Sequence, residues 1–193
     1  MMINVLGIVG SPRKKGNTHQ LVAKILEGAA SGGAAVHYVF LSGLSMKECD
    51  GCHVCWLGKE CSKHDDMNHL YLQINQADVL VLGTPVYWYG PTALMKGFMD
   101  RFVYYNCDCN RRWVKGKKVL LAIPFEDANR ETAEPVEQFF ERSLSYLEMN
   151  LAGKIVAGGL SSRGQAASRE DLMKAAFMLG KNMINADKAG FVR

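Results

Sequence analysis

The chain has 193 residues, of which 48% are hydrophobic and 22% are charged, and its formal net charge is +4. These values are typical of a globular domain and exclude a disordered protein. The basic excess is small and forms no stripe interleaved with aromatic residues, which argues against nucleic acid as a partner. No apolar run approaches the roughly 20 residues of a membrane span, which argues against a membrane as a partner. Because the chain also lacks the pattern of a secretory signal, we expect a single cytoplasmic domain over residues 1–193.

Hydrophobic patterns predict strands and helices that alternate along the chain. A strand at 3–9 leads through a polar loop into an amphipathic helix at about 18–30, and a mixed strand follows at 36–41. After the cysteine-rich segment 49–61, the spacing predicts a helix at 67–74, a fully apolar strand at 79–82 and a helix from 91 to 102. The stretch 104–116 is irregular, and beyond it we expect a strand at 119–123, a helix at 131–149, a strand at 155–159 and a helix at 171–184.

This alternation predicts an α/β fold with a five-stranded parallel sheet and helices on both faces. Right-handed crossovers restrict the topology, and the mixed second strand is suited to an edge of the sheet. The strand order 2-1-3-4-5 meets both conditions. In such a sheet, ligands bind beyond the carboxyl ends of the strands, where the order reverses between the first and the third strand.

The loop after the first strand has the composition of an anion site. Its backbone N–H groups and those of the following helical turn lack partners within the helix, and the helix dipole adds positive potential there. The spacing matches neither Gly-x-Gly-x-x-Gly nor Gly-x-x-x-x-Gly-Lys-Ser/Thr. The residues suited to hold a phosphate are Ser11, Arg13, Gly16, Asn17 and Thr18.

Four of the six cysteines fall within thirteen residues, which indicates metal or redox chemistry in a reducing compartment. Three interpretations fit Cys49, Cys52, Cys55 and Cys61: a 4Fe–4S cluster, a zinc site, and a site that is empty or holds a disulfide. A zinc site could use His64 in place of Cys49. The remaining pair, Cys107 and Cys109, stands too close in sequence for an unstrained disulfide, and we expect ordinary free thiols.

Two further groups of charged residues have a structural interpretation. Asp65 and Asp66 are expected to cap the helix that follows them. Lys96, Asp100 and Arg101 are expected to form ion pairs on a helix surface, because side chains four positions apart lie on the same face.

Taken together, the motifs resemble a known family. They are Gly10-Ser11-Pro12-Arg13-x-x-Gly16-Asn17-Thr18, Cys49-x-x-Cys52-x-x-Cys55, Asp65-Asp66-Met67, Thr84-Pro85-Val86-Tyr87-Trp88 and Lys96-x-x-x-Asp100-Arg101. In this order they are similar to the NAD(P)H-dependent FMN reductases, and within them to the iron-sulfur flavoproteins. The resemblance covers about the first 105 residues.

The resemblance implies a flavodoxin-like three-layer sandwich that binds FMN, with the flavin rather than a side chain carrying the chemistry. The first loop would hold the FMN phosphate, and the four cysteines from Cys49 to Cys61 would hold a 4Fe–4S cluster. The second cofactor loop would consist of Pro85, Val86, Tyr87, Trp88, Tyr89 and Gly90.

As a member of this family, the protein would pass electrons from NAD(P)H or a reduced carrier to a quinone, a flavin, a redox protein or an iron-sulfur cluster, as a homodimer or homotetramer. The alternative is a non-catalytic module that senses redox state or binds zinc through its cysteine loop. An aromatic turn and a phosphate loop would have no use in such a module.

Overall fold

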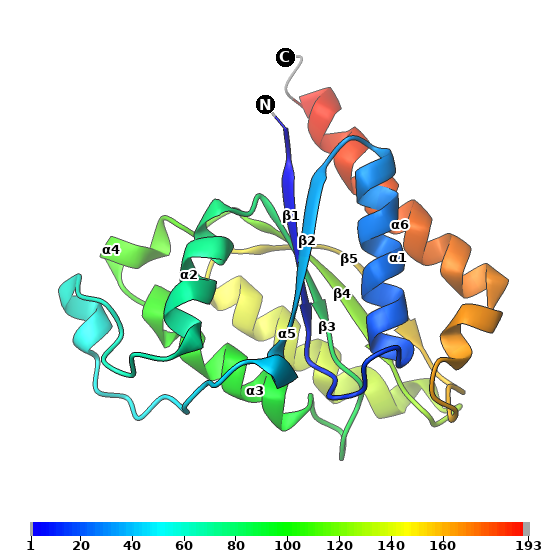
Figure 1. Cartoon of the computed structure of the whole chain (residues 1–193), viewed down its shortest axis with the longest axis horizontal. Coiled ribbons are helices and arrows are strands. Elements are labelled where there is room, and N and C mark those ends of the chain that lie inside the picture. Colours follow the sequence, from blue (N-terminus) through cyan, green and yellow to red (C-terminus); the bar gives the residue numbers. More distant parts are fainter. Residues whose placement is uncertain (1, 191–193) are drawn as a thin grey trace.

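The computed structural model describes residues 2–190, which contain a five-stranded parallel sheet in the order β2-β1-β3-β4-β5 (Figure 1). The predicted strand order is therefore confirmed. The strands are β1 Asn4–Val9, β2 Ala35–Phe40, β3 Val79–Gly83, β4 Lys118–Pro124 and β5 Asn150–Ala157.

The burial of the strands follows from their places in the sheet. Every residue of β3 is buried, and so is every residue of β4 after Lys118, as expected for strands with helices on both faces. In β2 the residues are half-buried or exposed. Within residues 2–190 this strand pairs only with β1 and forms an edge of the sheet, which accounts for its mixed composition.

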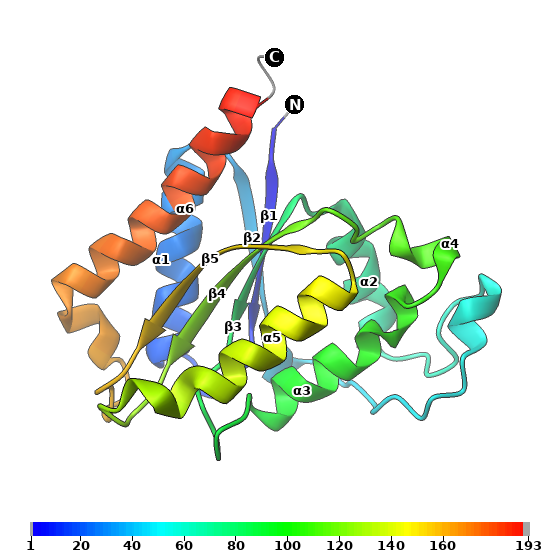
Figure 2. The same ribbon diagram turned by 180° about the vertical axis from the view of Figure 1, so that it is seen from behind.

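Helices form a layer on each face of the sheet, as the two opposite views in Figures 1 and 2 show. Helices α1 and α6 pack on one face, where Leu21, Ile25 and Ala176 belong to one apolar cluster. Helices α2, α3 and α5 pack on the other, where Phe98 and Phe140 belong to a second cluster. Their bounds are α1 Asn17–Ser31, α2 Asp66–Gln76, α3 Ala93–Asp100, α5 Glu134–Tyr146 and α6 Glu170–Gly190.

Helices α1 and α6 are in backbone contact at two glycines. A Cβ atom on Gly28 would lie 1.9 Å from the carbonyl oxygen of Phe177, and one on Gly180 would lie 1.9 Å from that of Ile25. No side chain fits at either position. The close crossing fixes α1 against α6.

Some element bounds differ from the prediction. The helix expected at 91–102 ends at Asp100 and continues as a 3₁₀ turn over Arg101–Tyr105. The helix expected at 131–149 covers only Glu134–Tyr146, after a 3₁₀ turn over Arg130–Ala133. The strand expected at 155–159 is β5, which begins earlier, at Asn150, and ends at Ala157. The stretch expected to be irregular contains the short helix α4 Asp108–Arg111. Among residues 2–190, none of the helices is both long enough and apolar enough to cross a bilayer.

Candidate functional site

The loops that follow β1, β3, β4 and β5 surround a cavity of about 140 Å³ at the carboxyl ends of the strands. The five residues of the first predicted loop line this cavity, and so do Pro85, Val86 and Tyr87 of the second loop. The strand order reverses between β1 and β3 at this edge, where open α/β sheets bind their ligands. The two loops that the sequence singled out are thus in one place.

The first turn of α1 faces this cavity, and its backbone N–H groups have no side-chain cap within the described residues. This turn also contains no acidic residue. Ser11 and Thr18 are buried beside it, and the Ser11 hydroxyl accepts a hydrogen bond from the Arg13 N–H at 3.2 Å. Free N–H groups, the positive end of a helix dipole and the Arg13 guanidinium together make a site for an anion.

The Asn17 side chain joins the start of α1 to the loop after β5 by hydrogen bonds. Its Nδ2 donates to the carbonyl oxygens of Leu160 at 3.2 Å and Ser162 at 2.9 Å, and its Oδ1 accepts from the Ala166 N–H at 3.0 Å. These bonds fasten the loop after β5 to the start of α1. Asn17 can therefore offer an anion its backbone N–H, while its side chain is committed to the protein.

The loop after β5 brings a second guanidinium to the cavity, which the sequence analysis missed. Arg163 lines the cavity and donates a hydrogen bond to the carbonyl oxygen of Lys14. Arg163 lies 150 residues after Arg13 in the sequence, in a polar loop without a motif. The only signal for it was the position of this loop directly after a predicted strand, because all parallel strands end at the same edge of the sheet.

The loop after β4 forms a further wall that the sequence analysis did not identify. Pro124, Phe125 and Glu126 line the cavity. Phe125 donates its N–H to the Ala157 carbonyl at 2.9 Å, and its own carbonyl accepts from the Leu160 N–H at 3.0 Å. This loop is therefore joined to the end of β5, and the cavity wall is continuous across the two loops.

Two buried threonines connect the first loop to the second. The Thr92 hydroxyl donates to the Gly10 carbonyl at 2.5 Å and accepts from the Met95 N–H at 3.1 Å, so that it also caps α3. The Thr84 hydroxyl accepts from the Thr92 N–H at 3.1 Å. Gly10 must lack a side chain, because a Cβ there would lie 2.8 Å from the Cβ of Met95. The two loops are fixed relative to each other by this network.

The second loop ends in a tight two-residue turn. Tyr87 and Gly90 exchange both backbone hydrogen bonds, at 2.8 and 3.0 Å, and the intervening Trp88 and Tyr89 have φ angles of 49° and 60°. Trp88 is 96% exposed and Tyr89 is 61% exposed. The structure therefore places Pro85, Val86 and Tyr87 against the cavity, and Trp88 and Tyr89 at the protruding tip of the turn.

A second candidate site lies in the cysteine loop. Cys49, Cys52, Cys55 and Cys61 all line one hollow, together with Arg101. Cys55 is buried, Cys52 is exposed and the other two are intermediate. Burial is the main cause that raises the pKa of the Cys55 thiol to about 11, and the neighbouring Cys61 adds to it. Positive charge near this hollow would favour the thiolate form of Cys55.

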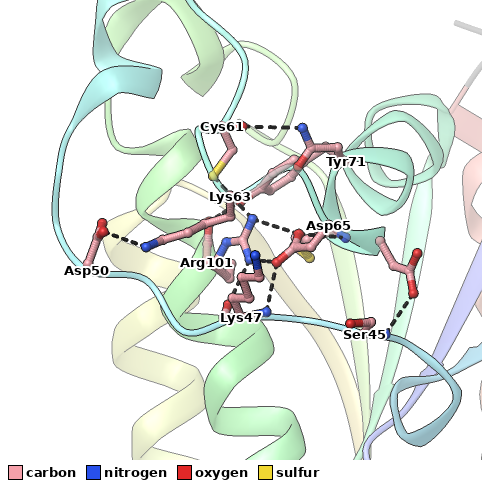
Figure 3. Close-up of polar contacts among 11 residues, drawn as sticks. Ser45, Lys47, Asp50, Cys61, Lys63, Asp65, Tyr71 and Arg101 are labelled. Carbon is pink, nitrogen blue, oxygen red and sulfur yellow. Dashed lines mark hydrogen bonds and ion pairs between the residues drawn. The ribbon is translucent and has the colours of Figure 1, made fainter.

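Arg101 supplies positive charge at the base of this loop (Figure 3). It is 1% exposed, and its guanidinium donates to both carboxylate oxygens of Asp65 at 2.6 and 3.1 Å, to the Lys47 carbonyl at 2.8 Å and to the Cys61 sulfur at 3.2 Å. Asp65 in turn accepts from the Lys47 and Met67 N–H groups. The ends of the cysteine loop are thus tied to α2 and to the segment after α3.

The prediction that Arg101 forms a surface ion pair is wrong. Arg101 follows the last residue of α3, and the 3₁₀ turn there directs its side chain inward. Lys96 and Asp100 do form the expected exposed pair, at 2.5 Å. Asp65 caps α2 as predicted and is also the buried partner of Arg101, a role that the sequence analysis did not assign.

The donor geometry bears on what the cysteine loop can hold. Over residues 2–190, no three His, Cys, Asp or Glu side chains are placed to bind one metal ion. Zinc needs four ligands that converge on one point, whereas a cluster of several irons presents separate attachment points to thiols spread around it. The structure places the four thiols around one hollow, with the Arg101 guanidinium hydrogen-bonded to the Cys61 sulfur.

Comparisons with known proteins agree with this geometry. Residues 3–191 match the NADPH-dependent FMN reductase family. An iron-sulfur flavoprotein of Archaeoglobus fulgidus is 36% identical over 95% of this chain and 80% of its own length, and iron-sulfur flavoprotein MJ1083 of Methanocaldococcus jannaschii is 30% identical over 72% of each chain.

A solved NAD(P)H:quinone oxidoreductase from Methanothermobacter marburgensis superposes with a TM-score of 0.71 at 16% identity, over 95% of this chain and 98% of its own. A flavodoxin from the domain Archaea superposes at 0.59 and 12% identity over 97% and 99%. These likenesses show a flavodoxin-like fold, as expected. The chain therefore belongs to the NADPH-dependent FMN reductase family of flavin-dependent oxidoreductases.

Proposed function

We propose that the protein binds FMN at the edge of β1 and β3 and passes electrons from NAD(P)H or a reduced carrier to an acceptor such as a quinone, a flavin or an iron-sulfur cluster. One observation carries the proposal: the uncapped start of α1, two arginines and the wall formed by Pro85, Val86 and Tyr87 share one cavity. This combination suits a phosphate joined to a flat ring.

The phosphate would lie at the start of α1. There it would receive hydrogen bonds from the backbone N–H groups of Asn17 and Thr18, the hydroxyl of Ser11 and the guanidinium of Arg13, and Arg163 would supply a second guanidinium. A dianion gains most from such oriented donors, because charge-assisted hydrogen bonds are about twice as strong as neutral ones.

The isoalloxazine ring would lie along the second loop. Backbone groups in the irregular segment that contains Pro85 and Val86 would address its pyrimidine edge, and Tyr87 would cover part of a face. When bound, FMN supplies the hydride and electron chemistry. The protein would orient the ring, and backbone N–H donors of the second loop would favour the negative charge of the reduced flavin.

The cysteine loop is proposed to hold a 4Fe–4S cluster through Cys49, Cys52, Cys55 and Cys61. The hydrogen bond from Arg101 to Cys61 at 3.2 Å would stabilise added negative charge on that sulfur. Hydrogen bonds to cluster sulfurs and nearby positive charge are among the factors that raise the reduction potential. Arg101 is thus proposed as a residue that positions the loop and tunes the site.

An assembly of two or four copies is the third part of the proposal. Trp88 and Tyr89 are exposed on the turn that follows the cavity-lining residue Tyr87, and both have positive φ angles, which are strained for these residue types. A contact that needs this turn would explain why the strain is kept. Contact with a second copy would bury both rings. It would also bring another subunit's groups close to the flavin.

The phosphate assignment is tested by titrating FMN into single variants and following flavin fluorescence. Arg13→Gln and Arg163→Gln each remove one guanidinium from the cavity, and each is expected to weaken binding about 10- to 100-fold, because a charge-assisted hydrogen bond contributes roughly 1.5–3 kcal/mol. Lys14→Gln is the matched control, since it removes an exposed cation from the same loop. Equal affinities in all three variants would refute the assignment.

The cluster assignment is tested by anaerobic reconstitution followed by iron and acid-labile sulfide analysis. Cys49→Ser and Cys61→Ser are expected to lower iron content to less than half of the wild-type value. The matched control is Cys109→Ser, which also removes one thiol from this region but lies outside the set of four. Iron loss that is as large in the control would contradict the assignment.

A further inference from the structure

Two cysteines outside the proposed cofactor sites are in direct contact with each other. Cys107 immediately precedes α4 and Cys109 lies in its first turn, and their sulfur atoms are 2.9 Å apart. Cys109 is exposed and Cys107 is intermediate. The sequence predicted ordinary free thiols here, and the structure adds that the two sulfurs face each other.

The surrounding residues hold this pair in place. Asn110 is 7% exposed, and its Nδ2 donates to the carbonyl oxygens of Tyr104 at 3.0 Å and Cys55 at 3.2 Å. Both thiols also lie 3.9 Å from that Cys55 carbonyl. The backbone of the Cys-Asp-Cys segment is therefore fastened on both sides, and the facing of the two sulfurs is a property of the fold.

We propose that Cys107 and Cys109 form a reversible dithiol–disulfide pair that reacts with small-molecule disulfides, separately from the four cysteines of the loop 49–61. This modification site lies beyond the proposed flavin chemistry and does not depend on it. Cys109 is exposed and thus accessible to a small disulfide, and the contact between the two sulfurs places the Cys107 thiol ready to react.

The reaction proceeds by two thiol–disulfide exchanges. The Cys109 thiolate attacks one sulfur of the small disulfide, forms a mixed disulfide and releases one small thiolate. The Cys107 thiolate then attacks the Cys109 sulfur and releases the second small thiolate. In total the protein dithiol loses two electrons and two protons, and the small disulfide becomes two thiols.

The short separation of Cys107 and Cys109 in sequence suits their disulfide to reversible oxidation and reduction rather than to stabilising the fold. A disulfide stabilises a fold mainly by closing a long loop, and this one would close a loop of only three residues. A Cys-x-Cys bridge is also strained, and strained, exposed disulfides are readily reduced. The pair would therefore be expected to follow the thiol–disulfide balance of its surroundings.

The chain offers a direct assay, because trypsin releases residues 102–111 as one peptide that contains Cys107 and Cys109 and none of the other cysteines. The full-length protein is treated with 2-hydroxyethyl disulfide, alkylated with N-ethylmaleimide, digested and examined by mass spectrometry. The expected product is an unalkylated peptide about 2 Da lighter than the dithiol form, restored to a doubly alkylated peptide by dithiothreitol.

A single variant reports on the second exchange step. In Cys107→Ser the resolving thiol is absent, so Cys109 is expected to accumulate the mixed disulfide that does not persist in the wild type. The serine side chain still suits the position before α4, which protects the fold. The proposal is overturned if wild-type Cys109 retains the mixed disulfide, if both thiols stay alkylatable under conditions that modify the variant, or if either one pairs with a cysteine of the loop 49–61.

Discussion

The buried pair of Arg101 and Asp65 gives the sharpest prediction about stability. Arg101→Gln removes the guanidinium and leaves the Asp65 carboxylate, whose side chain is 2% exposed, without its charged partner. The substitution also removes the bonds to the Lys47 carbonyl and the Cys61 sulfur. The ends of the cysteine loop would then lose their common anchor.

The expected magnitude follows from burial. Removing one partner of a buried pair costs about 3–5 kcal/mol of unfolding free energy, because the remaining charge is left desolvated. At roughly 2–4 °C per kcal/mol for a chain of this size, the melting temperature is expected to fall by about 6–20 °C. The matched control is Lys96→Gln, which breaks an ion pair on the neighbouring helix whose side chains are 50% and 46% exposed. Its cost is expected to stay below about 1 kcal/mol.

The assay is urea unfolding of the wild type and the two variants, followed by far-UV circular dichroism. Asp65→Asn adds a useful comparison, because asparagine still caps α2 while the charge is gone. In the double variant Asp65→Asn with Arg101→Gln, the total loss is expected to be smaller than the sum of the single losses by about 1–3 kcal/mol. Equal losses for Arg101→Gln and Lys96→Gln would refute the reasoning.

Three further predictions concern other parts of the chain. Burial raises the pKa of Asp65, but hydrogen bonds from Arg101 and nearby N–H groups outweigh it and leave the pKa below its usual 3.8, so the stability that the ionised carboxylate contributes is full above that value and is lost as pH falls through the lowered pKa. In acid titrations, the unfolding free energy of Asp65→Asn should therefore fall less steeply below about pH 4 than that of the wild type, and identical curves would contradict this. Gly28→Ala forces a methyl group into the backbone of α6 and should lower the stability of the protein in thermal melts by about 2 kcal/mol or more, whereas Gly97→Ala, with open space around it, should raise the stability by about 0.5–1 kcal/mol. If Gly28→Ala were tolerated, α1 and α6 would not cross closely. Asn-Gly in place of Trp88 and Tyr89 suits the positive φ angles, so it should raise the stability of the monomer by about 1 kcal/mol while weakening self-association measured by ultracentrifugation. Unchanged association would argue against this turn as a contact between copies.

The sequence was sufficient for those features that depend on local pattern. The apolar run 79–82 indicates an inner strand, because an inner strand is buried on both faces of the sheet. The mixed run 36–41 indicates an edge strand, because an edge strand is less completely covered. The polar loop before α1 was recognisable for a similar reason. Its glycines, hydroxyls and arginine lie close together in sequence, so the donors needed for an anion are visible at once.

The features that the sequence analysis missed depend on contacts between distant segments. Arg101 stands 36 residues from Asp65, and its spacing from Lys96 suggested a helix surface. Only the change to a 3₁₀ turn at the end of α3 directs its side chain inward. Arg163 was missed because its loop has no motif of its own, and its place at the cavity follows from the end of β5 and from the three hydrogen bonds of Asn17.

The most direct test of the proposed function is the anaerobic absorption spectrum of the protein after incubation with FMN, measured together with protein-bound flavin, iron and acid-labile sulfide. About one FMN, about four iron and about four sulfide per chain are expected, with the flavin bands bleached by NADH or NADPH. A protein that retains no flavin after FMN is added would contradict the proposed FMN site, and bound flavin without iron would contradict the role assigned to the four cysteines.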